Sequence, residues 1–266
     1  MQYAVDILDG LRRQAGLVGL IRCQRVIEGL HSMGHEVFHP DRPQRGLDMY
    51  PNVALINLLR ARLTGAGRDH KPLEMVKKPT FWLYYVWAIA VSAAGLALIS
   101  QASGVVWEAS ADQTAGAVAT IVGLISICNA VGRVLFGGMY DKYGRSLSMQ
   151  LVNILFINTA GVLILALSTR SIVVVIIGFV LGGLAYSGVT PTNSAFCRAY
   201  FGPAHYPVNF PLINSNLIFA SFGSTVSGAL YDAGGSYNST FFLIIGLAAV
   251  GIVCSLAISA IDKKGN

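Results

Sequence analysis

Residues 129–145 read NAVGRVLFGGMYDKYGR, and this stretch decides how the rest of the chain is organised. Its first part is apolar and rich in glycine, and it carries one arginine, Arg133. It then runs directly into Asp141, Lys142 and Arg145, where the apolar run ends. An ionised side chain inside a membrane-spanning helix is costly unless it reaches water or a partner. The pattern therefore predicts a membrane helix that ends at a membrane surface and contains one cation with a function.

Composition divides the chain into two parts. Residues 1–79 hold 12 of the 19 Lys and Arg residues and 8 of the 13 Asp and Glu residues. Because 54% of all 266 residues are hydrophobic and only 12% are charged, the apolar excess must lie in residues 80–266. Long apolar runs of this kind are typical of membrane helices. We therefore expect an all-α membrane protein with a soluble, cytoplasmic N-terminal segment, residues 1–79, and a transmembrane bundle, residues 80–266.

Six apolar segments follow the N-terminal segment, each near the roughly 20 residues that one membrane-spanning helix needs. They cover residues 81–103, 116–140, 148–167, 171–186 with an extension towards 200, 210–231 and 241–261. Lys and Arg near helix ends favour the cytoplasmic side of a membrane. They occur before the first segment and after the second, fourth and sixth, whereas the alternate connections contain only Arg170. We therefore expect six transmembrane helices in a multi-pass protein of the plasma membrane, with both termini cytoplasmic.

The N-terminal segment contains no apolar run long enough to span a membrane. Its histidines His31, His35 and His39 are spaced by four residues, which could align them on one helix. A glycine and a proline interrupt any such helix, and no pair of cysteines accompanies the histidines. We therefore expect neither a metal nor a cofactor.

The motif at the end of the second apolar segment resembles that of a known family. The stretch from Gly137 to Arg145 is similar to the G-x-x-x-D-x-x-G-R signature of major facilitator superfamily transporters, found in their cytoplasmic loops between helices 2 and 3 and between helices 8 and 9. Asn129-x-x-Gly132-Arg133 resembles the eighth helix of the oxalate/formate antiporter branch, which is monocarboxylate transporter-like. The resemblance covers about residues 74–262 and implies the C-terminal six-helix half of such a transporter.

This resemblance implies secondary active transport, by antiport or proton coupling, of a small organic anion such as formate, oxalate or lactate. Oxalate/formate-type members bind the substrate carboxylate with an arginine of the eighth helix, which corresponds to Arg133. The planar fork of arginine suits this task because it can donate two parallel hydrogen bonds to a carboxylate. Arg133 lies roughly 10 Å before the helix end at Tyr140, so snorkelling to the surface remains the alternative. The residues implied in a gating motif of the cytoplasmic loop are Gly137, Asp141, Gly144 and Arg145.

Three further residues are candidates to line a substrate pathway. Asn129 lies one turn before Arg133 and can share its face of the helix. Tyr84 and Tyr186 lie deep in the first and fourth segments, where a buried hydroxyl needs a hydrogen-bond partner. A polar cavity and ordinary helix packing can each provide that partner.

Family members that exchange dicarboxylates carry a second cation in the eleventh helix. The corresponding residues 214–217 read NSNL and contain neither Lys nor Arg. One cation balances one negative charge, so the sequence favours a monocarboxylate, with Asn214 and Asn216 as neutral hydrogen-bond donors.

Alternating access in this superfamily places the substrate between two six-helix halves. We therefore expect the bundle to pair with a second six-helix half, from another copy of the chain or from a separate chain. The other expected partners are the lipid bilayer and the small organic anion, and no nucleic acid. The alternative is a truncated, non-transporting scaffold or regulatory partner. An enzyme is not expected, because no cluster of His, Asp and Glu lies in the spans to perform acid–base or metal chemistry.

Overall fold

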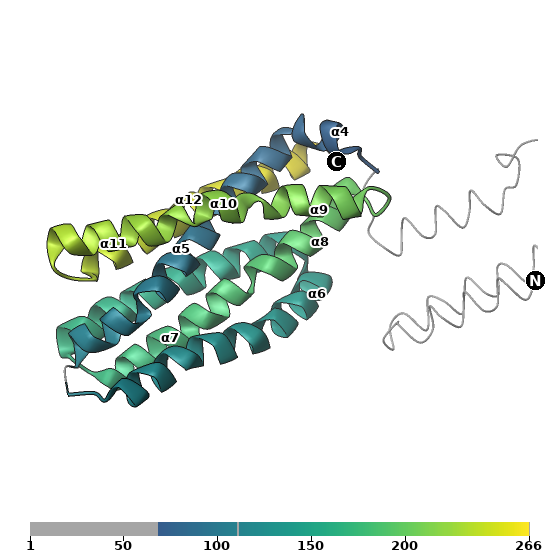
Figure 1. Cartoon of the computed structure of the whole chain (residues 1–266). Helices are drawn as coiled ribbons and strands as arrows, with labels where there is room; N and C mark the ends of the chain where they lie inside the picture. The colour runs from purple at the N-terminus through teal and green to yellow at the C-terminus, as the bar shows by residue number, and fades with distance from the viewer. Residues whose placement is uncertain (1–68, 111, 266) are drawn as a thin grey trace, which may run out of the picture. The chain divides into compact units, whose positions relative to one another are not determined.

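The computed structural model describes residues 69–110 and 112–265, which belong to one compact unit of the chain, Asn57–Asn266. The described residues form α-helices and contain no strand, which confirms the all-α class for this part of the chain (Figure 1). The helices are α4 (Pro72–Val76), α5 (Pro79–Ala109), α6 (Ala115–Thr169), α7 (Ile172–Ser187), α8 (Val189–Phe201), α9 (Tyr206–Asn214), α10 (Asn216–Ala220), α11 (Phe222–Gly234) and α12 (Asn238–Gly265). The three histidines considered as metal ligands lie outside the described residues.

Within the described ranges, four helices are long and apolar enough to cross a membrane. They are α5, α6, the combined α7 and α8, and α12 up to Lys263. The sequence predicted six separate spans, and two differences account for the lower count. The second and third predicted segments are joined in the single 55-residue helix α6, and the fifth is divided among α9, α10 and α11.

Helix α6 is interrupted at one residue, Gly144. Its backbone angles are φ 79° and ψ −177°, a conformation that glycine adopts readily and other residues almost never do. A straight helix of this length would extend about 80 Å, far more than the roughly 30 Å of a bilayer's hydrocarbon core. The connection of residues 141–147 that the sequence predicted is therefore helical on both sides of a single non-helical residue.

The two halves of α6, residues 115–143 and 145–169, both pack against the same part of α7. A Cβ atom added to Gly183 of α7 would overlap the carbonyl oxygen of Ile125, from the first half. One added to the adjacent Gly182 would contact Thr159, from the second half. Since these two residues meet α7 at one level, α6 must reverse its direction at the interruption.

Helices α9, α10 and α11 follow one another along a single row (Figure 1). Pro211 within α9 provides no backbone N–H, and the turns at Ser215 and Ser221 are tightened, with hydrogen bonds between residues three apart. The two serine hydroxyls donate to the carbonyl oxygens of Leu212 and Ile218, each at 2.7 Å. Local hydrogen bonding thus divides the row into pieces that are individually too short to count as spans.

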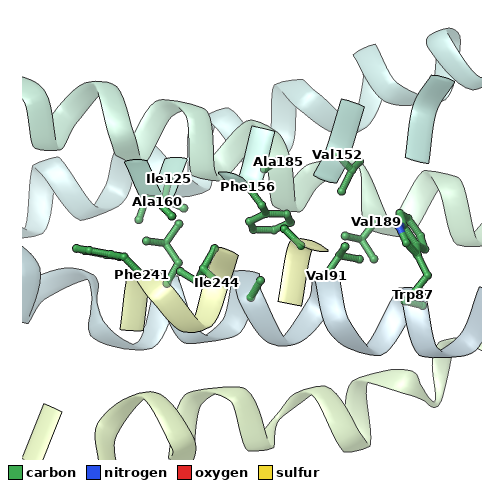
Figure 2. Packing of buried hydrophobic residues seen from close by; sticks show 14 of the residues in the cluster. Trp87, Val91, Ile125, Val152, Phe156, Ala160, Ala185, Val189, Phe241 and Ile244 are labelled. Carbon is green, nitrogen blue, oxygen red and sulfur yellow. The ribbon is translucent and has the colours of Figure 1, made fainter. Parts of the chain in front are cut away.

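Helix α5 is the most enclosed of the long helices. About two thirds of its apolar window, 67%, is buried, against 39% for α6 and for α12. Apolar side chains from α5, α6, α7, α8 and α12 pack together around it (Figure 2). Those in contact there include Trp87, Val91, Ile125, Val152, Phe156, Ala160, Ala185, Val189, Phe241 and Ile244.

The bundle has one end rich in basic residues, which we call the basic end. It carries Lys77, Lys78, Lys142, Arg145, Arg198 and Lys263. Residues 69–78, assigned by composition to the N-terminal segment, pack on this end, where the N–H of His70 donates to the carbonyl of Phe201 and Met75 is fully buried.

The opposite end carries Glu108, Asp112, Arg170 and Asp232. The carboxylate of Glu108 accepts hydrogen bonds from the hydroxyl of Ser236 at 2.6 Å and from the backbone N–H of Tyr237 at 2.9 Å. Burial raises the pKa of the Tyr237 hydroxyl, which stays protonated at neutral pH. These contacts tie α5 to the start of α12.

Candidate functional site

Arg133 lies exposed near the middle of the bundle's height. A Cβ atom added to the preceding residue, Gly132, would overlap the side chain of Ser187 in α7. The adjacent α7 residue, Tyr186, has its ring against Gly95, which is at the centre of α5. Arg133 is therefore level with the middle of α5. Within its own half of α6, residues 115–143, it lies about four residues, or 6 Å, from the midpoint. A cation at this height is remote from both ends of the bundle.

Two of the predicted pathway residues, Asn129 and Tyr186, lie beside Arg133. Asn129 is one helical turn earlier, and its Oδ1 atom is buried without a hydrogen-bond partner in the described part of the chain. Tyr186 belongs to the part of α7 that faces Arg133's helix at this height, because the next residue, Ser187, lies against Gly132. Arg133 itself makes no ion pair with any described residue. The structure thus places a guanidinium, an amide and a phenol at the same height of the bundle, and neither the guanidinium nor Oδ1 of Asn129 has a partner in the described part of the chain.

Tyr84 and Asn214 belong to a different polar group inside the bundle. The hydroxyl of Tyr84, which is fully buried, donates to Oδ1 of Asn193 at 2.8 Å, and its ring stacks on Phe196 with centroids 3.6 Å apart. The Nδ2 atom of Asn193 donates in turn to Oδ1 of Asn214 at 3.5 Å. This chain of hydrogen bonds joins α5, α8 and α9. The hydroxyl of Tyr84 already has a partner within the bundle, while Asn214 is partly exposed.

Asn216, expected to donate to the substrate, is directed at α5. Its Nδ2 atom donates to the carbonyl oxygen of Ala88 at 3.0 Å and to the hydroxyl of Ser92 at 2.9 Å, and the residue is fully buried. A similar link, which the sequence did not indicate, joins α5 to α6, because the indole N–H of Trp87 donates to Oδ1 of Asn153 at 3.0 Å. Both asparagines hold helices to α5.

The four residues of the loop signature have separate positions. Gly137 has open space beside it, Asp141 is exposed, and Gly144 is the point of reversal in α6. Arg145 alone turns into the bundle, where its side chain is 8% exposed.

Arg145 is held by partners from two other helices. Its Nε atom donates to the hydroxyl of Tyr200 in α8 at 2.8 Å, and Nη2 lies 2.8 Å from the carboxylate of Asp262 in α12. The Tyr200 hydroxyl also donates to Asp262, and Ser259 accepts from the guanidinium at 3.1 Å. The sequence analysis did not identify Tyr200 or Asp262. Both residues lie near helix ends on the same side as Arg145, and this shared position was the only signal in the sequence that could have indicated them.

A shallow groove of about 460 Å³ lies between α5 and the first half of α6, towards the opposite end. It is lined by Ser103, Trp107, Ala115, Val118, Ala119, Val122, Gly123 and Ser126. The lining has no charged residue, so the groove by itself offers nothing to neutralise an anion. Ser126 is seven residues, or two turns, before Arg133, so this lining residue lies on the same face of α6 about 10 Å from the arginine, which is not part of the lining.

Metal chemistry finds no support among the described residues, where no three His, Cys, Asp or Glu side chains gather. Comparison with known proteins adds no functional assignment: no family model matches the chain, and no curated protein matches it. The arginine in the middle of the bundle, with Asn129 and Tyr186 beside it, is therefore the strongest candidate for a functional site.

Proposed function

We propose that this protein is one half of a secondary transporter for a small carboxylate anion, and that its bundle crosses the plasma membrane six times with both ends in the cytoplasm. The resemblance of residues 129–145 to the major facilitator signature supports this proposal, as do the four long apolar helices. Transport would proceed by rocking of two halves around a site near the middle of the membrane.

The geometry of α6 and of the α9–α11 row supports six crossings. The reversal at Gly144 gives α6 two antiparallel halves of 29 and 25 residues, each long enough to span a bilayer. The row from α9 to α11 extends from Tyr206 to Gly234 and connects the basic end to the opposite end. The gathering of basic residues at one end supports a cytoplasmic location for that end.

Arg133 is the single observation that carries the transport proposal. Its side chain is exposed level with the middle of α5, where lipid alone would leave the charge without compensation. A carboxylate would satisfy the guanidinium with two charge-assisted hydrogen bonds. Asn129 and Tyr186 carry donors that can complete the contact. Tyr84 and Asn216, which are bonded within the bundle, would support the site without touching the anion.

A second candidate function is a non-transporting membrane scaffold. It is favoured by the hydrogen bonds that asparagine side chains make between helices. Asn153, Asn193 and Asn216 each use a side-chain group to join helices, as a purely structural bundle requires. In a scaffold, Arg133 would snorkel towards lipid headgroups or contact a partner protein.

Uptake into proteoliposomes separates the two functions. Vesicles containing the purified protein would be tested with labelled formate, lactate and oxalate, against Arg133→Gln and the matched variant Lys142→Gln, which removes an exposed charge near the end of the same half-helix. Transport predicts uptake by the wild type and by Lys142→Gln, with a loss of about tenfold or more in Arg133→Gln. Absence of uptake and of binding for all three anions would favour the scaffold.

A further inference from the structure

The first half of α6 presents a narrow seam of small side chains with Arg133 within it. Its members recur every three or four residues and are all exposed or partly exposed: Ala119, Gly123, Ser126, Ala130, Arg133 and Gly137. Cβ atoms added to Gly123 or Gly137 would meet nothing within 4 Å. The spacing averages 3.6 residues, the period of the α-helix, so the seam stays on one face, and small residues let two helix backbones approach closely.

A partner for this seam must also accommodate its charge. Arg133 has no carboxylate opposite it, because the acidic residues of the long helices lie near their ends, at Glu108, Asp141 and Asp262 in the described part of the chain. Packing the seam against an apolar surface would bury the guanidinium without a counterion, which is strongly unfavourable.

A second copy of the same chain gives a defined arrangement. The distribution of basic residues gives every copy one orientation in the membrane, so a dimer's twofold axis must lie along the membrane normal. This axis places the two seams face to face and the two Arg133 side chains at the same depth. Two like charges so placed repel each other in a medium of low polarity, and one divalent anion between them compensates both charges at once.

We propose that two copies of the chain associate through this seam and enclose one dicarboxylate, with each Arg133 holding one of its carboxylates. The inference rests on the proposed anion site at Arg133 and extends it to the ligand's charge and to the identity of the second half. One chain offers one cation, but the symmetric pair offers two, which compensate both charges of a dicarboxylate. Dimer formation and dicarboxylate binding are then coupled, because each makes the other more favourable.

The experiment measures mass and stoichiometry together, with malonate as the probe and formate at equal ionic strength for comparison. The full chain, purified in detergent, would be followed by light scattering corrected for detergent and by calorimetry. Malonate should shift the protein from monomer to dimer with one malonate bound per two chains, and formate should not. In Arg133→Gln the malonate-dependent shift should disappear, whereas in Lys142→Gln it should persist.

A second variant tests the seam without changing its charge. Gly123→Leu fills the open space at the contact and should reduce dimer formation at least tenfold, while Gly161→Leu, at an exposed glycine with similarly open space in the other half of α6, should leave it unchanged. A Cβ atom at either glycine meets nothing within 4 Å in the monomer, so both variants should fold. One malonate per chain on a stable monomer, or an anion-dependent dimer that survives Arg133→Gln, would overturn the inference. Carboxylate uptake accompanied by either result would leave the proposed transport function intact.

Discussion

The guanidinium of Arg145 lies 2.8 Å from the carboxylate of Asp262, although 117 residues separate them in the sequence. The two partners differ in their access to solvent, since the side chain of Arg145 is 8% exposed and that of Asp262 is 36% exposed. The pair joins the reversal of α6 to the end of α12. Removing one partner or the other should therefore have unequal consequences.

Asp262→Ala should destabilise the protein by about 1–3 kcal/mol, because it leaves the buried guanidinium without its counterion. Replacing the arginine as well, in Arg145→Met with Asp262→Ala, should recover part of this loss, since an apolar side chain of similar length then fills the site. Thermal unfolding in detergent would measure both. A double variant no more stable than Asp262→Ala alone would show that the ion pair is not the source of the loss.

Gly144 and Gly137, two glycines of the same signature, should respond differently to alanine. Gly144→Ala places a side chain at φ 79°, which should cost about 1–3 kcal/mol and lower the yield of folded protein. Gly137→Ala lies in regular helix with no atom near the new methyl group, so it should be neutral or stabilise by up to about 1 kcal/mol. Unfolding temperature compared between the two variants tests this. Equal losses would mean that the conformation of Gly144 does not matter.

The sequence predicted the helical class and the places where apolar segments end, because charge and glycine mark these places locally. It did not predict that one residue, Gly144, would suffice for the reversal, since the backbone angle depends on how both halves pack on α7. The sequence analysis also missed the division of the fifth segment at Ser215 and Ser221. There each serine hydroxyl bonds a backbone carbonyl three residues earlier, in competition with the regular hydrogen bonds of the helix.

The candidate site was predictable where it depended on neighbours in sequence. Asn129 and Arg133 share a face because they are one turn apart. The partner of Tyr84 could not be found in this way, since Asn193 lies 109 residues later, on another helix. Asn216 was expected to face a substrate because the resemblance places residues 214–217 where family members carry a second cation, but its side chain is held by hydrogen bonds to α5.

Tyr84→Phe and Tyr186→Phe should separate support of the bundle from contact with the anion. The first change leaves Asn193 without its buried donor and should cost about 1–2 kcal/mol of stability, with anion affinity changed less than about twofold. The second should leave the unfolding temperature near that of the wild type and weaken anion binding. Unfolding and calorimetric titration with malonate measure both quantities. The opposite pattern would move Tyr84 into the binding site.

Single cysteines at the two ends of the bundle test the proposed orientation. In a background with its four native cysteines replaced by serine, Lys142→Cys and Asp232→Cys introduce thiols at exposed positions at opposite ends. A membrane-impermeant maleimide added to intact cells should label only the second, and disruption of the cells should expose the first. Labelling of Lys142→Cys from outside would reverse the orientation inferred from the basic residues.

Arg133→Lys should be a poor replacement, although it keeps the positive charge. A carboxylate held by the planar guanidinium receives two parallel hydrogen bonds, which a compact ammonium cannot reproduce. The loss of one charge-assisted hydrogen bond corresponds to about 1.5–3 kcal/mol and weakens binding by about tenfold or more. Calorimetric titration of malonate into the wild type, Arg133→Lys and the matched variant Arg198→Lys, at an exposed site of the basic end, tests this expectation. Arg198→Lys should bind like the wild type, and unfolding should be unaffected in both variants because neither arginine is buried. If Arg133→Lys binds malonate as tightly as the wild type while remaining folded, the arginine contributes only its charge, and the proposed pair of parallel hydrogen bonds is wrong.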